Sequence, residues 1–403
     1  MKIAIVSVSP VYSKSNGSLH MAKNLTLMFN KFGEKTKVFS TGEAEAEIIE
    51  RGGYHEKIVK SNLPSASRSK KIKVLDLLYL LLLKKRYSVI RNNQNEALFT
   101  ELQNYHPDVI ISIDRYFTEL LIKYKRYNKD VKLFVKTDDI SDVDIGAKLR
   151  EEFIVNSRSN SLVKKVKLFI TRLINKRMLS FYNTQYEKML KGFDKVIFLT
   201  HEDLNRTRSK YKNFNKKMFV IPPPIGRAQV TIKKPKKYAR TVLFVGGYAD
   251  LKNADAIQVI KEKIAPETKE LNFIVAGKGV KEENFNNFKS VGFVKDIDKL
   301  IDSADICLVP LRYGTGLKIK ILDFLNRGKP IVGTSIAFEG FPVQNLRDVI
   351  ICDDFKLYPN ILRDLAGNYK LRKQMQARSI RLLNYFSYKT VYNQWRVLIH
   401  SKT

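Results

Sequence analysis

Residues 308–334 read LVPLRYGTGLKIKILDFLNRGKPIVGT and constrain the fold more than any other stretch of the chain. An apolar run that ends at Pro310 is followed by a turn with two glycines, and residues 318–327 then carry apolar side chains at helical spacing. Gly328 and Pro330 stand where a helix ends, and a new apolar strand pattern begins there. The segment predicts strand, turn, helix and strand in succession, the repeating unit of a parallel sheet covered by helices.

The turn in this segment has the chemistry of an anion site. A glycine turn that leads into a helix leaves N–H groups available to an anion, and the helix dipole is positive at that end. Lys318, expected in the first helical turn, would add a full positive charge, and Asp323 is a candidate to bind a sugar or ribose hydroxyl. The alternative is an ordinary strand–helix–strand unit in which Lys320 and Asp323 form a surface ion pair.

The amino-terminal half also alternates strand patterns with helical patterns, which favours a second parallel sheet covered on both faces. Strands are expected at 3–8, 37–40, 109–113, 132–136 and 195–199, with a helix at 20–32. Ligands of such sheets bind beyond the carboxyl ends of the strands. The loops at 11–17, 114–116 and 137–142 are therefore the candidate binding loops of this half.

The chain has 403 residues, which is too long for one ordinary core and suits two domains. The proline-rich stretch from Pro222 to Pro235 interrupts any strand or helix and is the expected hinge. The longest apolar run, 74–83, is about half the length of a membrane span, and the start of the chain is too short for a convincing signal peptide. Two cysteines and five histidines show no metal-binding or redox spacing, so we expect a cytoplasmic protein without a metal or other cofactor.

The net charge of +33 is distributed unevenly. Residues 1–239 carry a balance of +24 and residues 361–403 one of +8, whereas residues 240–360 carry only +1. Such asymmetry implies an anionic partner for the amino-terminal half.

Basic amphipathic stretches suggest what that partner is. Residues 60–91 and 158–191 each hold nine basic residues and one acidic residue around apolar runs. In the second stretch, Leu162 to Leu179 has the pattern of a helix that lies on an anionic membrane surface. The alternatives are a core helix with a solvated basic face and contact with nucleic acid, of which nucleic acid is the least favoured.

Several short motifs occur in the order found in glycosyltransferase family 4, also called group 1, and the chain resembles this family over roughly residues 242–341. The motifs, besides the segment described first, are VLFVGG at 242–247, FIVAGKG at 273–279, VGFV at 291–294 followed by Asp296, Ala304-Asp305, and Glu339-Gly340-Phe341. The resemblance implies the GT-B architecture, an α/β fold of two Rossmann-like domains that face each other across a cleft. The expected domains are residues 1–224, which bind the acceptor, and residues 225–380, which bind a nucleotide sugar. A C-terminal helix at 381–403 is expected to cross back to the first domain, with Trp395 as its anchor or as an ordinary packing residue.

The resemblance and the loop positions together give the expected site residues. The donor-binding residues are Gly247, Lys252, Gly277, Phe293, Val294, Arg312, Gly314, Thr315, Gly316, Leu317, Lys318 and Asp323. The acceptor-binding candidates are Ser15, Asn16, Gly17, Arg115 and Tyr116, and the catalytic candidates are Asp138, Asp139 and Lys318. Either aspartate is a candidate to orient the acceptor hydroxyl, or both simply belong to a strand-end turn.

The chain departs from the family pattern in two places. The family often has two glutamates eight positions apart, and here those positions hold Thr315 and Asp323. An arginine that is common after the first glycine loop is replaced by Tyr248, and Lys252 follows as a possible substitute or as a solvated lysine. The first change removes a carboxylate from the expected sugar site, so the sequence does not identify the sugar.

The favoured function is that of a nucleotide-sugar-dependent glycosyltransferase. Its acceptor would be lipid-linked or an envelope polysaccharide at the inner membrane face, and the family resemblance implies that the anomeric configuration is retained. Preorganised N–H groups with Lys318 would stabilise the charge of the leaving diphosphate without a metal. The alternatives are a basic nucleic-acid-binding protein and a nucleotide-sugar epimerase of the same fold.

Overall fold

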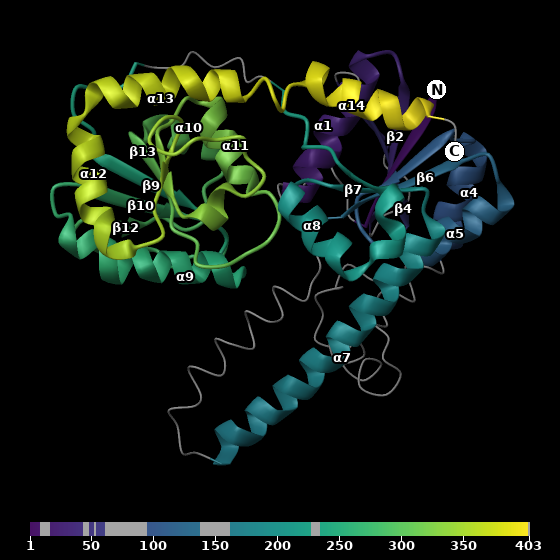
Figure 1. Cartoon of the computed structure of the whole chain (residues 1–403), viewed down its shortest axis with the longest axis horizontal. Helices are drawn as coiled ribbons and strands as arrows, with labels where there is room; N and C mark the ends of the chain where they lie inside the picture. Colours follow the sequence, from purple (N-terminus) through teal and green to yellow (C-terminus); the bar gives the residue numbers. More distant parts are fainter. Residues whose placement is uncertain are drawn as a thin grey trace. The chain divides into compact units, whose positions relative to one another are not determined.

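A computed structural model of the chain describes residues 1–8, 17–42, 48–51, 54–60, 95–137, 162–226 and 234–401. The chain divides into two compact units. Unit 1 comprises Met1–Pro224 and Val391–Thr403, and unit 2 comprises Ile225–Thr390. Each unit is built on its own sheet, with helices packed against it (Figure 1). None of the helices in these ranges is long and apolar enough to cross a membrane.

The sheet of unit 1 has the strand order β3-β4-β2-β1-β5-β6-β7-β8, and every neighbouring pair is parallel except β3 and β4. The strands are β1 (Lys2–Ser7), β2 (Lys35–Gly42), β3 (Ile48–Arg51), β4 (Tyr54–Lys60), β5 (Val109–Ser112), β6 (Lys132–Thr137), β7 (Lys195–Phe198) and β8 (Met218–Val220). The helices are α1 (Gly17–Lys31), α4 (Glu96–Tyr105), α5 (Thr118–Tyr127), α7 (Leu162–Gly192), α8 (His201–Lys210) and the 3-10 helix η1 (Lys212–Lys217).

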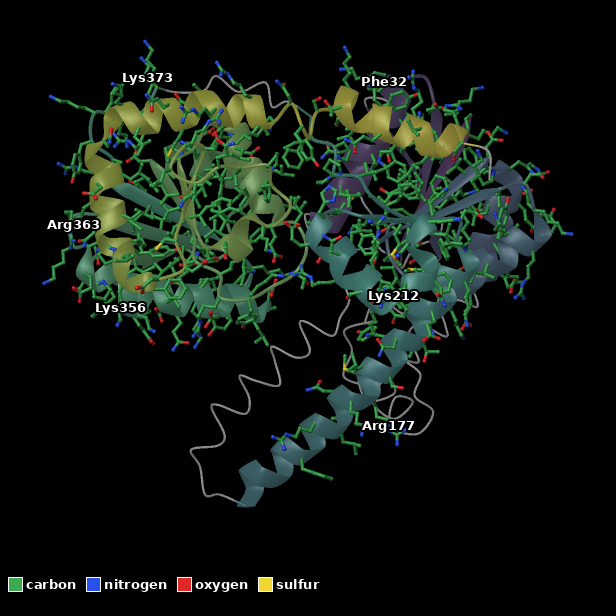
Figure 2. All side chains as sticks on the ribbon, in the orientation of Figure 1. Phe32, Arg177, Lys212, Lys356, Arg363 and Lys373 are labelled. Atoms are coloured by element: carbon green, nitrogen blue, oxygen red, sulfur yellow. The ribbon has the colours of Figure 1, made fainter. Side chains whose placement is uncertain are left out.

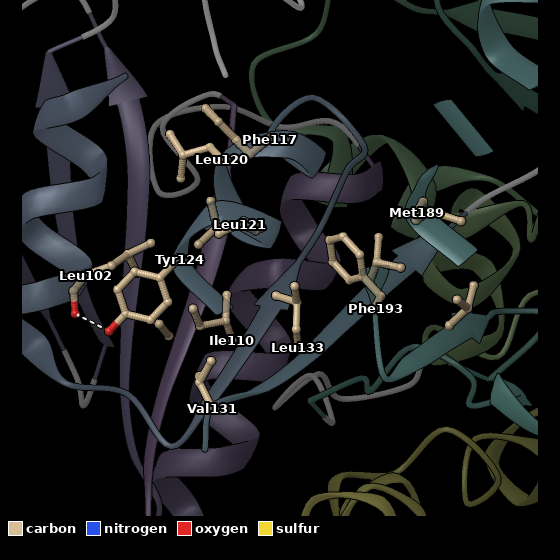
Figure 3. Packing of buried hydrophobic residues seen from close by; sticks show 14 of the residues in the cluster. Leu102, Ile110, Phe117, Leu120, Leu121, Tyr124, Val131, Leu133, Met189 and Phe193 are labelled. Atoms are coloured by element: carbon tan, nitrogen blue, oxygen red, sulfur yellow. Dashed lines mark hydrogen bonds between the residues drawn. The ribbon is translucent and has the colours of Figure 1, made fainter. Parts of the chain in front are cut away.

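The apolar residues of the central strands explain this sheet. All four residues of β5 and the last five of β1 and of β6 are buried, as expected for parallel strands with both faces covered. Helices α4 and α5 pack on one another beside the sheet, where the Tyr124 hydroxyl donates a hydrogen bond to the Leu102 carbonyl at 3.0 Å (Figure 3). The five predicted strands are present. The three that the sequence did not predict, β3, β4 and β8, are short or rich in charged residues.

The C-terminal helix α14 (Tyr388–His400) packs on unit 1 through aromatic side chains. Trp395 is fully buried, with its ring 5.7 Å from that of Phe29 on α1 and 6.3 Å from that of Phe134 on β6. Tyr392 stacks on Phe32 at 4.3 Å between ring centres. The predicted return of the C-terminal helix to the first domain is therefore confirmed, and Trp395 lies at the centre of that contact.

The sheet of unit 2 has the order β11-β12-β10-β9-β13-β14-β15, and only β11 runs antiparallel to its neighbour. The strands are β9 (Thr241–Val245), β10 (Asn272–Ala276), β11 (Glu283–Phe285), β12 (Phe288–Ser290), β13 (Ile306–Val309), β14 (Ile331–Gly333) and β15 (Ile350–Ile351). The helices are α9 (Leu251–Val259), the π-helix η2 (Ile260–Ile264), η3 (Ala265–Glu267), α10 (Ile297–Ser303), α11 (Ile319–Asn326), η4 (Ser335–Phe338), η5 (Phe355–Leu357), α12 (Tyr358–Gly367) and α13 (Tyr369–Leu382).

The segment from β13 through α11 to β14 has the predicted strand–turn–helix–strand order. Gly328, with φ of 62°, closes α11, and the Cys307 amide of β13 donates to the Pro330 carbonyl at 2.8 Å, which joins the two strands. The α/β class with two mainly parallel sheets is thus confirmed. It places the glycine turn at the carboxyl edge of the unit 2 sheet.

Candidate functional site

Three loops meet at the carboxyl edge of the unit 2 sheet, after β9, β10 and β12. The Tyr248 amide donates to the Lys278 carbonyl at 2.9 Å, and the Gly277 amide donates to the Gly292 carbonyl at 2.8 Å. A Cβ atom on Gly277 would lie 2.0 Å from the Gly246 carbonyl oxygen, so only glycine fits at this position. The loops are therefore packed backbone to backbone, and a ligand at this edge can approach their main chain closely.

The glycine-rich turn between β13 and α11 completes the edge. Gly314 and Gly316 have φ of 135° and 72°, values that side chains rarely tolerate. A Cβ atom on Gly314 would lie 2.8 Å from Cδ of Lys252, so the stem of this lysine runs against the turn. Arg312 donates two hydrogen bonds to the buried carboxylate of Asp255 on α9, one of them from Nε to Oδ2 at 2.8 Å. Arg312, expected to bind the donor, therefore holds the turn against α9 in this structure.

Lys318 lies where the turn meets α11. It is the N-cap residue of this helix, one position before the first turn in which the sequence placed it. Its side chain is buried, and its Nζ lies 3.5 Å from Oε2 of Glu339, in the loop after β14. Thr315 and Leu317 are also buried. The ammonium of Lys318 adds to the positive potential at this end of α11.

Lys320 extends from α11 toward the first turn of α9. Its Nζ donates to Oδ1 of Asn253 at 2.8 Å and lies 4.3 Å from the ring centre of Phe244. Nδ2 of Asn253 in turn donates to the Gly247 carbonyl at 3.2 Å. The surface ion pair of Lys320 with Asp323, considered as the alternative from the sequence, is therefore not formed, because the ammonium is bound to Asn253.

Lys252, Lys318 and Lys320 thus come together beside the glycine turn, and we call them the three-lysine cluster. Burial is the main cause that lowers the pKa of Lys320, to about 7; Lys252 and Lys318 lower it as well, and Asp250 raises it. Lys252 lies 3.4 Å from Oδ2 of Asp250. Positive charge concentrated at a glycine turn and a helix N-terminus is a site for a phosphate-bearing ligand.

Asp323 is half-buried on α11. Burial, together with the negative charge of Asp298, raises the pKa of its carboxyl to about 7, although Arg327 lowers it. A carboxyl group with this pKa changes its charge near neutral pH, and its ionised form accepts hydrogen bonds only.

Replacing Asp323 with asparagine is expected to raise the KM for the donor, because the predicted role of the ionised carboxylate is to accept hydrogen bonds from the ribose hydroxyls. In the wild type this KM should fall as pH rises toward about 7, where Asp323 ionises, and in Asp323→Asn this fall below about pH 7 should be lost. Steady-state kinetics between about pH 6 and pH 8 measure both effects. A variant that unfolds while it keeps its donor affinity would show that Asp323 is a structural residue.

The residues expected to border the nucleotide base lie at the same edge. Phe293 and Val294 directly follow Gly292, whose carbonyl is bonded to the glycine loop after β10. The side chain of Phe293 is 68% exposed, which leaves its ring accessible to a ligand. Their contact with a base remains a prediction.

The acceptor candidates belong to unit 1, and part of them lies in the described structure. Arg115 lies over the rings of Tyr182 and Tyr186 of α7, at 5.3 and 5.4 Å from the ring centres. The amide of Tyr116 donates to Oδ1 of Asp114 at 2.9 Å. Gly17 is the first residue of α1. The remaining candidates lie outside the described residues: Ser15, Asn16, Asp138 and Asp139.

Sequence reasoning missed two polar residues at the edge of unit 2, and in unit 1 it named Asp114 only as part of a candidate loop. The sequence marks Asn253 only as part of a helix start and Lys320 only as a surface residue, although the alternation of Lys318 and Lys320 places a second charge near the turn. Asp114, at the end of β5, accepts a hydrogen bond from the Val8 amide at 3.1 Å, and burial raises its pKa to about 6. The part of the chain that the structure describes contains no cluster of three or more metal-binding side chains.

Residues 239–354 match the protein family described as Glycosyl transferases group 1. An uncharacterized 44.6 kDa protein in the cps region of Klebsiella pneumoniae is 23% identical over 255 residues. The aligned stretch covers 57% of this chain and 61% of that protein, so the chain spans about six tenths of the length of this relative.

Solved structures resemble the whole chain. Sucrose-phosphate synthase from Thermosynechococcus elongatus aligns with a TM-score of 0.68 and 12% identity over 98% of each chain. HepE from Anabaena, in complex with UDP and glucose, aligns with a TM-score of 0.64 and 11% identity over the full length of both chains. A TarM mutant from S. aureus, in complex with UDP and sugar ligands, aligns with a TM-score of 0.65 and 10% identity, also over both full lengths.

The family match covers the unit that contains the three-lysine cluster, and the structural likeness extends to both units. At 10–12% identity the likeness establishes the fold alone, and the family match covers residues 239–354. The chain therefore has the GT-B fold, and its second unit is similar to the group 1 glycosyltransferases.

Proposed function

We propose that the chain transfers a sugar from a nucleotide-diphosphate sugar to a lipid-linked or envelope-polysaccharide acceptor at the cytoplasmic face of a membrane. The observation that carries the donor assignment is the pair Lys252 and Lys318 at the glycine turn of unit 2. A diphosphate carries two negative charges, and Lys252 and Lys318 supply two ammonium groups together with a helix N-terminus.

The same groups fit the chemistry of transfer. When the bond between sugar and diphosphate breaks, negative charge develops on the departing phosphate oxygen. Lys318 is the N-cap residue of α11 and lies beside the amides of the turn. These groups are in place before the reaction, so they stabilise the developing charge without reorganisation. We propose retention of the anomeric configuration from the group 1 resemblance, and we assign no protein nucleophile.

The structural neighbours support a nucleotide sugar as donor. HepE was solved with UDP and glucose, and a trehalose-6-phosphate protein from E. coli was solved with UDP-2-fluoro glucose. Mass-spectrometric screening of UDP-, GDP- and dTDP-sugars tests this proposal directly. Binding and slow hydrolysis of at least one of them is expected, and the absence of both for all three classes would contradict it.

The proposed membrane contact rests on helix α7 of unit 1. Figure 1 shows this long helix running out from the sheet of its unit, and Figure 2 shows side chains such as Arg177 along it. Phe169 and Leu173, one helical turn apart, are 69% and 41% exposed, and Arg172 and Lys176 are exposed near them. Exposed apolar side chains among basic ones match the interface of an anionic membrane, where each basic residue contributes about 1 kcal/mol.

Liposome co-sedimentation is expected to show binding that grows with the fraction of anionic lipid and weakens with added salt, because the contact is peripheral and electrostatic. Replacing four lysines of α7 with glutamate should abolish binding and leave donor hydrolysis intact. The four are Lys164, Lys165, Lys167 and Lys176.

A matched control reverses four exposed lysines of unit 2 and should leave sedimentation nearly unchanged. These are Lys269, Lys289, Lys370 and Lys373. Equal sedimentation with neutral and anionic liposomes, or equal losses in both variants, would rule out docking through α7 and point to an acceptor in solution.

A further inference from the structure

Lys320 carries an amine beside the glycine turn for which the transfer scheme described above has no role. Its ammonium lies between the Asn253 amide, at 2.8 Å, and the ring of Phe244, whose centre is 4.3 Å away. Asn253 is itself buried and donates to the Gly247 carbonyl. A Cβ atom on Gly246 would lie 2.6 Å from Cγ of Asn253, so this amide sits directly against the glycine loop. Lys320 is thus linked through Asn253 to the glycine loop that the donor is expected to approach.

The charges around Lys320 favour an anion. Two elements contribute titratable groups that act on it: Lys252 and Asp250 at the start of α9, and Lys318 at the start of α11. Oδ2 of Asp250 lies 3.4 Å from Nζ of Lys252, and Oε2 of Glu339 lies 3.5 Å from Nζ of Lys318. Each of these two carboxylates thus pairs with another lysine, whereas Nζ of Lys320 is held by a neutral amide. The neutral Asn253 amide holds the amine of Lys320 in place without neutralising its charge. An anion bound here would therefore contact an ammonium whose hydrogen-bond partner is an amide rather than a carboxylate.

We propose that Lys320 is a third diphosphate-binding lysine of the donor site and that it takes up a proton when the nucleotide sugar binds. This proposal rests on the proposed donor function and extends it to a residue and a proton that the transfer scheme does not include. Lys320 would also compensate for Tyr248, which stands where the family often has an arginine.

The direction of the pH effect follows from linkage. Without donor, the pKa of Lys320 is about 7, so the side chain is mostly neutral above that pH. A bound diphosphate favours the charged form and raises this pKa, so binding above about pH 7 draws a proton from solution. Donor affinity should then fall as pH rises, by up to about tenfold per pH unit, until the pH reaches the pKa of the bound state.

Asp323 titrates in the same pH range, but its contribution to donor binding releases a proton where that of Lys320 takes one up. Its carboxyl also has a pKa of about 7, and a donor that binds its ionised form would release a proton below that pH. The two contributions separate by pH, because the release occurs below about pH 7 and the uptake occurs above it. An intact nucleotide sugar is the right probe, since its doubly esterified diphosphate has no pKa in this range.

Isothermal titration calorimetry in buffers of different ionisation enthalpy counts the protons. The probes are UDP-glucose, GDP-mannose and dTDP-glucose, and the one that binds most tightly is titrated at about pH 6 and about pH 8.5. The wild type should take up close to one proton at the higher pH. Lys320→Arg, which stays charged, should bind with uptake near zero, and Lys320→Met should lose at least tenfold in affinity at the lower pH.

Lys329→Arg is the matched control. This lysine is also in unit 2, and burial lowers its pKa, but its Nζ donates to the carbonyls of Asp302 and Ala304. Its replacement should leave the uptake at its wild-type value. Two results would overturn the role of Lys320. One is proton uptake by Lys320→Arg equal to that of the wild type, and the other is wild-type proton uptake near zero. Failure of the wild type to bind any of the three probes would instead contradict the proposed function.

Discussion

Replacing Lys318 with methionine is expected to lower kcat/KM for the nucleotide sugar by more than tenfold. Methionine fills nearly the same space but removes the ammonium beside the glycine turn. A hydrogen bond to a charged group contributes about 1.5–3 kcal/mol, and each 1.4 kcal/mol is a factor of about ten. Because the charge stabilised is that of the leaving diphosphate, we expect the loss to appear in kcat as well as in KM. Steady-state kinetics with purified protein measure both.

Thermal melting separates a catalytic loss from a folding defect in this variant. Replacing Lys318 removes the cost of burying an ammonium group but leaves the Glu339 carboxylate without this partner, and because the two effects oppose each other the melting temperature should change little. Lys356→Met, which changes an exposed lysine of the same unit, serves as the control and should leave the kinetics unchanged. Unchanged kinetics in a folded Lys318→Met protein would remove this residue from the donor site.

Replacing Trp395 with alanine is expected to destabilise unit 1 by about 3–5 kcal/mol, the usual cost of removing a large aromatic side chain from a core. The ring is fully buried between Phe29 and Phe134, and it anchors α14 to the sheet of unit 1. For a domain of this size such a loss lowers the melting temperature by roughly 10 °C. Differential scanning calorimetry should show the shift.

Trp395→Phe provides the matched control, because it keeps an aromatic ring in the same place and should recover part of the lost stability. Nucleotide-sugar binding by unit 2 should survive in both variants below their melting temperatures, since the donor residues all lie in that unit. A melting temperature of Trp395→Ala within about 2 °C of the wild type would show that α14 is held by other contacts.

The layout of the fold could be predicted from the sequence because its signals are local. The strands β1, β5, β6 and β7 are short apolar runs, and the helix α11 is bounded by a glycine turn and by Gly328. The strands β3 and β4 escaped detection because charged and polar residues interrupt the apolar pattern of both.

The candidate site was predictable only as a list of positions. The glycine turn and Lys318 could be recognised from spacing, but the partner that each side chain selects depends on packing between elements. Lys320 lies three residues before Asp323, which suggests an ion pair along the helix, yet its ammonium reaches Asn253 in the first turn of α9, 67 residues away. Arg312 likewise donates to Asp255 across a similar sequence distance, a contact that the sequence did not predict.

The most direct test of the proposed donor site is a crystal structure of the protein with a nucleoside diphosphate bound. We predict that the diphosphate lies beside the turn at Gly314 and Gly316, within hydrogen-bonding distance of the Nζ atoms of Lys318 and Lys320. A diphosphate bound elsewhere on unit 2, with the three-lysine cluster unchanged and not in contact with it, would contradict the assignment of this cluster to the donor.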